Sequence, residues 1–179
     1  MHYKTTYPSP IGIITLASDG ENLTGLWNEG QKYHGDAIMG DMALNDNISV
    51  FDDAKKWLDK YFAGEKPHIS DLPLAPAGSE FRRKVWDILC EIPYGEFITY
   101  GGIAKKMAVK LGKESMSSQA VGGAVGHNPI SIIIPCHRVV GSNGSLTGYA
   151  GGIKTKIKLL ELEGADLSGL FAPSKGTAL

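Results

Sequence analysis

The first part of the chain alternates or runs in β-forming residues over residues 3–7, 11–17 and 22–28. Turn-forming residues separate these runs at Pro8-Ser9-Pro10 and at Ser18-Asp19-Gly20. Because proline and glycine interrupt strands and allow the chain to reverse, this pattern predicts an antiparallel meander.

After these runs, residues 30–48 are polar and rich in Gly, Asn and Asp, which predicts a loop with a marginal helix. Apolar residues return at helical spacing between residues 52 and 62, and Gly64 ends the predicted helix. Trp57 lies on the apolar face of this helix and is expected in the core.

Residues 66–78 contain several prolines and have the composition of a linker. We therefore expect an α+β protein with a small antiparallel-sheet α/β domain over residues 1–75 and a mostly helical domain over residues 76–170. Residues 171–179 are expected to form a flexible tail.

The pattern of the second domain predicts helices over residues 79–90, 100–107 and 117–126, with a short strand at 96–99. Two helices joined by a short turn form the arrangement that places a second helix against DNA. The helix over 117–126 is rich in glycine and alanine, which lowers its helix propensity and leaves room for another backbone or a bulky ligand.

A β-branched run over residues 132–140 predicts a buried strand, which Pro-Cys-His-Arg at 135–138 interrupts. A glycine-lined loop at 148–152 follows. The last predicted helix ends at Gly164, and its side chains divide into two expected sets. We expect Ile153, Ile157 and Leu160 to face inward and Lys154, Lys156 and Lys158 to face outward.

Composition limits the possible functions. No apolar run approaches the ~18 residues of a membrane span, and no signal peptide is evident, so we expect a cytoplasmic protein with reduced thiols. The histidines show no paired spacing with Cys90 or Cys136, so neither a metal nor a cofactor is expected. Residues 1–75 hold 6 Lys+Arg and 11 Asp+Glu, whereas the remainder holds 12 and 8. This asymmetry suggests that a polyanion would meet the second domain, although ordinary surface scatter also explains it.

Cys136 is the candidate nucleophile, because a thiol at a buried, rigid and polar position is not needed for packing. A free thiol has a pKa of about 8.5, so it needs a nearby base or a positive charge to react at neutral pH. His137 could supply the base, and Glu163 on the last helix could orient it. The alternative is a satisfied core histidine beside a small buried cysteine.

The full motif set resembles the O6-alkylguanine-DNA alkyltransferases, also called methylated-DNA–protein-cysteine methyltransferases. The resemblance rests on Asn-Pro at 128–129, Pro-Cys-His-Arg-Val at 135–139, Gly-Tyr-Ala-Gly-Gly at 148–152 and Leu-Glu-Gly at 162–164. Phe-Arg-Arg-Lys-Val-Trp at 81–86, Ile-Pro-Tyr-Gly at 92–95 and Thr-Tyr at 99–100 match the same family. It covers residues 79–165 closely, and it implies a ribonuclease H-like first domain and a winged helix-turn-helix-like second domain.

The resemblance also implies the function and the roles of individual residues. A monomer would bind double-stranded DNA that contains O6-alkylguanine, or O4-alkylthymine, and would transfer the alkyl group irreversibly to Cys136. His137 and Glu163 would activate the thiol, Tyr100 would donate a proton or hydrogen bond to the departing base, and Asn128 would brace the turn. The residues expected to bind DNA or wall the base pocket are Ser117, Ser118, Gln119, Ala120, Gly122, Gly123, Val125, Arg138, Val139, Tyr149 and Ala150.

Three features depart from the family pattern. Gln119 stands where relatives usually carry an arginine, Ser131 where many carry a proline, and the turn through 109–116 is about five residues longer than usual. On the resemblance, Gln119 and the longer turn are expected to affect base flipping, and Ser131 is expected to affect the width of the base pocket. The thiol is unchanged. Two other functions remain open, namely a non-catalytic protein that recognises lesions and a cysteine hydrolase that uses Cys136 and His137.

Overall fold

The computed structural model describes residues 1–36, 38 and 40–174. The chain divides into two compact units. Unit 1 comprises Met1–Gly78 together with Pro129–Ile133, and unit 2 comprises the rest of the chain. The sequence predicted one domain boundary, between residues 75 and 76. It did not predict that the short segment Pro129–Ile133, which precedes Cys136, belongs to unit 1.

Unit 1 is built on a four-stranded sheet with the strand order β3-β2-β1-β4. The antiparallel strands β1 (His2–Ser9), β2 (Gly12–Ser18) and β3 (Leu23–Asn28) form the predicted meander. The three-residue strand β4 (Met42–Leu44) pairs parallel to β1, within the segment that had been expected to form a loop with a marginal helix.

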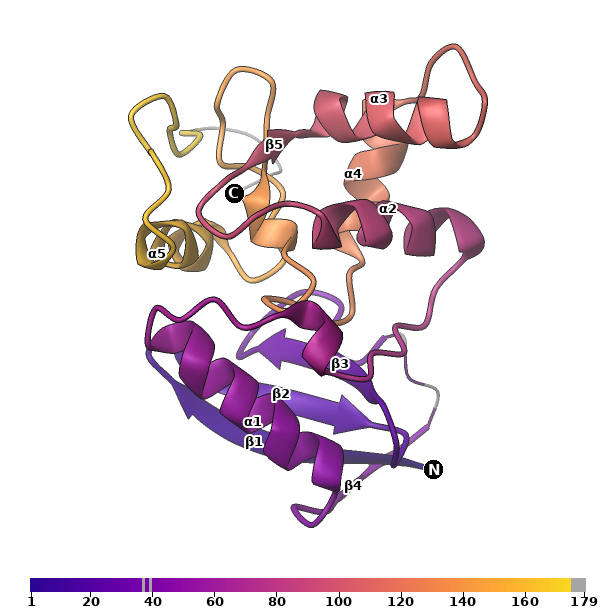
Figure 1. Ribbon diagram of the computed structural model, residues 1–179, viewed down its shortest axis with the longest axis vertical. Coiled ribbons are helices and arrows are strands. Elements are labelled where there is room, and N and C mark those ends of the chain that lie inside the picture. Colours follow the sequence, from indigo (N-terminus) through magenta and orange to yellow (C-terminus); the bar gives the residue numbers. More distant parts are fainter. Residues whose placement is uncertain (37, 39, 175–179) are drawn as a thin grey trace. The chain divides into compact units, whose positions relative to one another are not determined.

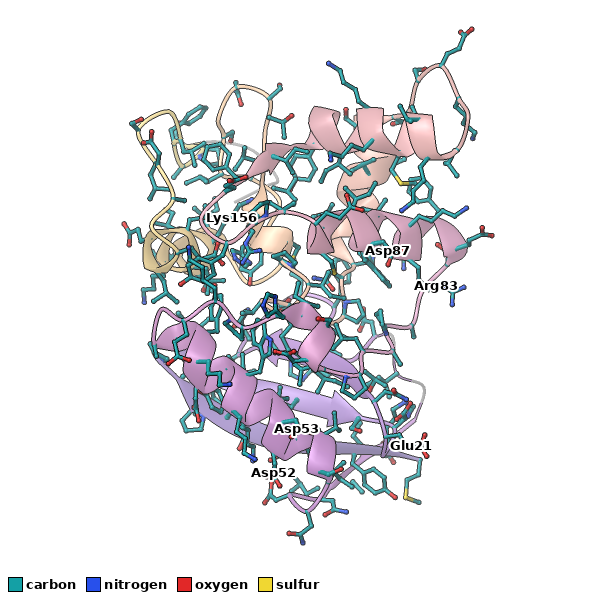
Figure 2. All side chains as sticks on the ribbon, in the orientation of Figure 1. Glu21, Asp52, Asp53, Arg83, Asp87 and Lys156 are labelled. Carbon is teal, nitrogen blue, oxygen red and sulfur yellow. The ribbon has the colours of Figure 1, made fainter. Side chains whose placement is uncertain are left out.

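Helix α1 (Ser49–Phe62) lies across one face of the sheet (Figure 1). Its inward face carries Trp57, which is buried as expected, while Asp52 and Asp53 project from the exposed side (Figure 2). The short 3-10 helix η1 (Ile69–Asp71) follows, and the indole of Trp57 donates a hydrogen bond of 2.9 Å to the carbonyl of His68.

Unit 2 is mostly helical, with α2 (Glu80–Cys90), α3 (Tyr100–Lys110), α4 (Ser118–Gly126) and α5 (Ile153–Leu162). A serine caps each of two helices: the hydroxyl oxygens of Ser79 and Ser117 accept hydrogen bonds from the backbone of the first turns of α2 and α4. Trp86 is buried, and its indole donates a hydrogen bond to the carbonyl of Ala124 at 2.8 Å, which joins α2 to α4.

Unit 2 also contains a two-stranded parallel sheet. Strand β5 (Ile98–Thr99) pairs with β6 (Val139–Val140), and the 3-10 helix η2 (Cys136–Arg138) leads directly into β6. Consequently the N-terminus of α3 lies beside the segment that follows the candidate nucleophile.

Phe171, the first residue of the expected tail, is paired, because its backbone forms hydrogen bonds with Gly144 and Leu146. The remainder of that expected tail, residues 175–179, lies outside the described residues. In the part of the chain that the structure describes, no helix is both long and apolar enough to cross a membrane.

Candidate active site

Cys136 lies in a 3-10 helix and not in a strand. The prediction of a strand over residues 132–140 was wrong except at Val139–Val140. Pro135 has φ −83° and ψ 67°, and the Cys136 amide donates a 2.8 Å hydrogen bond to the carbonyl of Ile134. Together these values define an inverse γ-turn around Pro135. Because proline has no N–H to contribute to a sheet, the chain turns here and presents Cys136 at the start of η2.

A buried carboxylate organises the residues after Cys136. Glu163, at the C-cap of α5, accepts a hydrogen bond from Nε2 of His137 at 2.6 Å and from the Nε and Nη2 atoms of Arg138, both at 2.9 Å. The backbone N–H of Gly95 donates to the same carboxylate at 3.1 Å. Arg138 also donates to the carbonyl of Ile92 at 2.6 Å. The structure therefore brings together His137 and Glu163, as expected.

The protonation states of this network follow from burial and charge. Burial acts to raise the pKa of Glu163, but hydrogen bonds from His137 and Arg138, together with the charge of Arg138, outweigh it and lower that pKa to about 2. Complete burial lowers the pKa of His137 and outweighs the opposing effect of Glu163. We therefore assign a neutral imidazole whose Nε2–H donates to Glu163, which leaves the lone pair on Nδ1. This Nδ1 atom has no hydrogen-bond partner among the protein atoms that the structure describes.

Tyr94 and Gly95, in the turn that follows α2, also contact this network, and the sequence had assigned a site role to neither. Gly95 has φ +83°, and a Cβ there would lie 2.8 Å from the carbonyl oxygen of Glu163, so only glycine allows this approach. The centroid of the half-buried Tyr94 ring lies 5.7 Å from the guanidinium carbon of Arg138. The Ile-Pro-Tyr-Gly turn thus fixes both Arg138 and Glu163.

Tyr100 is placed by the β5–β6 pairing at the first residue of α3. Its hydroxyl donates to the carbonyl of Thr147 at 3.1 Å. Burial, and secondarily the negative charge of a Cys136 thiolate, raise the pKa of the Tyr100 phenol. The phenol therefore keeps its proton at neutral pH, as a proton donor must. Gly148 makes room for this hydroxyl, because a Cβ there would lie 2.5 Å from it.

Lys156 contradicts the expectation that it faces outward. Its side chain is fully buried, and its Nζ donates to the carbonyls of Val139 and, at 3.0 Å, Thr147 (Figure 2). Burial lowers its pKa to about 8, while the charge of Cys136 acts in the opposite direction. The spacing contained the signal, because a residue three positions after Ile153 and four before Leu160 lies on their face of the helix.

The other residues expected around the thiol occupy several environments. The amide of the buried Asn128 donates to the carbonyl of Ile134 at 2.7 Å, which braces the turn before Cys136 as expected. Tyr149 is buried, with its ring edge-on to His137 at a centroid distance of 6.5 Å, and Ala150 is half-buried.

The second cysteine, Cys90, is half-buried. Burial of the thiol group and the charge of Asp87 raise its pKa to about 11, which makes it a poor nucleophile at neutral pH. Cys136 is therefore the better candidate of the two cysteines.

Helix α4 exposes four of its six residues that the sequence had assigned to DNA or the base pocket. Ser118, Gln119, Ala120 and Gly123 are exposed, as is the capping Ser117, whereas Gly122 is half-buried. The side chains of three other assigned residues, Val125, Arg138 and Val139, are buried. Val125 and Val139 pack in the interior, and Arg138 is held by Glu163 and by the carbonyl of Ile92, so their side chains do not form a DNA-facing surface.

The described residues contain no group of three or more His, Cys, Asp or Glu side chains that could hold a metal ion.

Residues 80–165 match the family model of the 6-O-methylguanine DNA methyltransferase DNA-binding domain, and residues 2–76 match its ribonuclease-like domain. The chain belongs to this family.

Curated members of the family cover nearly the whole chain. The methylated-DNA–protein-cysteine methyltransferase of Haemophilus influenzae is 42% identical over 161 residues, which is 90% of this chain and 86% of that protein. The protein of the same name from Methanosarcina acetivorans is 46% identical over 164 residues, which is 91% of this chain and 99% of that protein.

Solved structures agree with this assignment. Mycobacterium tuberculosis OGT in complex with DNA is similar with a TM-score of 0.79 and 42% identity, over 90% of this chain and 92% of that chain. The O6-methylguanine methyltransferase of the same organism matches with a TM-score of 0.76 and 42% identity, over 98% of this chain and 97% of that chain.

Proposed function

We propose that this protein repairs DNA by transferring the alkyl group of O6-alkylguanine, and of O4-alkylthymine, to the sulfur of Cys136. The observation that carries the proposal is the buried arrangement of His137, Glu163 and Arg138 directly after Cys136, in a chain of this family. In the reaction a bond forms between the sulfur and the alkyl carbon, the bond from that carbon to O6 breaks, and its electron pair stays on the base.

The neutral His137 acts as the base in this proposal. Its Nδ1 lone pair accepts the thiol proton of Cys136 through a water molecule, and the ionised Glu163 stabilises the imidazolium that forms. Arg138 keeps Glu163 ionised and does not contact DNA. Nearby Lys156 adds positive charge that favours the Cys136 thiolate, because its pKa of about 8 leaves it mostly protonated at pH 7.

Tyr100 acts on the leaving base. The departing guanine gains negative charge, and a proton or hydrogen bond from the phenol to its N3 would let it leave neutral. In the free protein the hydroxyl is held by the carbonyl of Thr147, so the base must take the place of that acceptor.

Double-stranded DNA is the proposed partner of unit 2. The exposed residues of α4, with Gln119 foremost, would enter the minor groove and occupy the space of a nucleotide flipped towards Cys136. Exposed lysines on and after α3 would contact phosphates; these are Lys105, Lys106, Lys110 and Lys113. We propose a monomer that uses neither metal nor cofactor, in the reducing cytoplasm, where Cys136 stays a thiol.

The test is intact-mass measurement after incubation with duplex DNA that carries one O6-methylguanine. We expect one methyl group per chain, attached at Cys136, and never more repaired DNA than protein, because a thioether has no good leaving group. Cys136→Ser should abolish transfer and keep DNA binding, whereas Cys90→Ser should preserve both.

Two outcomes would overturn the proposal. Binding without a mass change would indicate a non-catalytic lesion-recognition protein, and sustained turnover of ester or peptide substrates would indicate a cysteine hydrolase.

A further inference from the structure

The segment that precedes the nucleophile is held by unit 1, not by the unit that contains Cys136. Pro129–Ile133 belongs to unit 1, and its middle pairs with strand β3. The Leu26 amide donates to the carbonyl of Pro129 at 2.9 Å, and the Ser131 amide donates to the carbonyl of Leu26 at 3.0 Å. These two bonds fix the register of the segment on β3.

A buried side chain from the loop after β3 adds a third attachment. The hydroxyl of Ser131 donates to Oε1 of Gln31 at 3.1 Å. The same oxygen accepts hydrogen bonds from the backbone N–H and the side-chain amide of Asn28, at 3.0 and 3.2 Å. Ser131 is fully buried and Gln31 nearly so, and a buried acceptor with three donors is fixed in position.

The attached segment contains a strained residue. Ile132 has φ +71°, a left-handed conformation that is rare for a β-branched side chain. The Ile133 amide donates to the carbonyl of Ser131 at 2.8 Å, so the strain lies in a γ-turn of the less common, positive-φ kind. Strained backbone of this kind persists only where the surroundings determine it, and it concentrates at functional sites.

The strained turn is close to Cys136 along the chain. The second γ-turn, around Pro135, begins at Ile134, two residues after Ile132, and ends at the Cys136 amide. Two successive tight turns leave little freedom between Ser131 and the thiol, so a change of register at Ser131 must alter how Cys136 is presented.

We propose that Gln31 is a positioning residue for alkyl transfer, which acts through Ser131 and the γ-turn at Ile132 to hold Cys136 in its reactive orientation. This inference rests on the proposed function and extends it, because it gives the first unit a residue-level role in the chemistry.

The test separates positioning from simple stabilisation. Gln31→Met keeps the length of the side chain but removes the acceptor, and Ser131→Ala removes the donor. Gln31→Glu keeps an acceptor oxygen and is the conservative variant. The matched control is Thr24→Val on β3, because Thr24 is also buried but its hydroxyl has no hydrogen-bond partner among the described residues.

Each variant is mixed in excess with duplex DNA that carries one O6-methylguanine, and the single-turnover rate is measured against protein concentration. We expect Gln31→Met and Ser131→Ala to lower the maximal rate about tenfold or more, because small misplacements of reacting groups are costly. The concentration that gives the half-maximal rate should not change. The double variant should be no slower than the slower single variant, whereas Gln31→Glu and Thr24→Val should react at the natural rate.

Natural maximal rates in Gln31→Met and Ser131→Ala, with only a lower melting temperature, would overturn the inference. A second readout keeps it separate from the proposed function, namely the rate at which iodoacetamide alkylates Cys136 in a Cys90→Ser background without DNA. If the natural protein transfers no methyl group, the proposed function fails. Slower alkylation in both variants would still support positioning, and unchanged alkylation would refute it.

Discussion

Replacing Glu163 by glutamine tests the network that follows Cys136. Glutamine is nearly isosteric with glutamate, but it is neutral and offers one acceptor oxygen in place of two. Four N–H groups point at this carboxylate, from His137, from Arg138 twice and from Gly95. Glu163→Gln therefore leaves donors facing an NH2 group and leaves the buried guanidinium of Arg138 without a counter-charge.

The expected loss of stability can be estimated in two ways. The pKa of Glu163 is lowered from 4.5 to about 2, and this difference corresponds to about 3 kcal/mol of unfolding free energy at pH 7. Breaking a buried ion pair by removing one partner costs about 3–5 kcal/mol. Because the two estimates agree, we expect Glu163→Gln to lower the unfolding free energy by about 3 kcal/mol.

The assay is urea unfolding at pH 7 of the natural protein, Glu163→Gln and a control, Glu161→Gln. Glu161 is exposed on the same helix, so its substitution should change the unfolding free energy by less than about 0.5 kcal/mol. The alkyl-transfer rate of Glu163→Gln should also fall, because His137 loses the group that orients it. A loss below about 1 kcal/mol for Glu163→Gln would refute the charge argument.

The pH dependence of stability gives an independent check. Since the folded-state pKa of Glu163 is depressed, its stabilisation is present above pH 4.5 and is lost as the pH falls from there towards about 2. The comparison is made in a His137→Gln background, so that no imidazole titrates at this site. In that background, the decrease in unfolding free energy caused by Glu163→Gln should be smaller at pH 3 than at pH 5. An equal decrease at both pH values would show that the charge of Glu163 is not responsible.

Three further predictions concern the base and the DNA. Tyr100→Phe should slow single-turnover transfer about 100-fold at saturating DNA with little change in affinity, whereas a cost confined to affinity would exclude the proton-donor role. Gly148→Ala should slow transfer because its Cβ displaces the Tyr100 hydroxyl; Gly64→Ala has a similar φ of +81° and an empty surrounding, and should only reduce the melting temperature. Gln119→Arg should tighten DNA binding and increase the slope of log affinity against log salt by about one, and an unchanged slope would place Gln119 away from the phosphates.

The sequence predicted the elements whose formation depends on residues close together in the chain. Ser79 and Ser117 cap their helices, and the turn residues separate three strands, because capping and chain reversal depend on neighbours within a few residues. The three-residue strand β4 was missed because its pairing with β1 comes from a distant part of the chain. The same limit concealed the return of Pro129–Ile133 to unit 1.

The two clearest errors at the site have a common physical cause. A β-branched run was expected to form a strand and a lysine to face solvent, and both expectations follow average preferences. Here Pro135 prevents a continuous ladder, and Lys156 is buried because two backbone carbonyls satisfy its amine. Average preferences do not include such partners. The family motif, in contrast, predicted that His137 and Glu163 interact, and they share a hydrogen bond.

A nucleophile that reacts once places unusual demands on its surroundings. On the proposed function, Cys136 never has to release a product from its sulfur or return to a starting conformation, so rigidity around it brings no kinetic cost of the kind that limits many enzymes. The chain is held on both sides of this residue, by the γ-turn at Ile132 before it and by the Glu163 network after it. Because the first attachment precedes Cys136 and the second follows it, loosening the first should leave the hydrogen bond between His137 and Glu163 intact and change only how the thiol is presented. The Gln31 and Glu163 variants should therefore slow transfer by separate routes, and their effects on the free energy of activation should add.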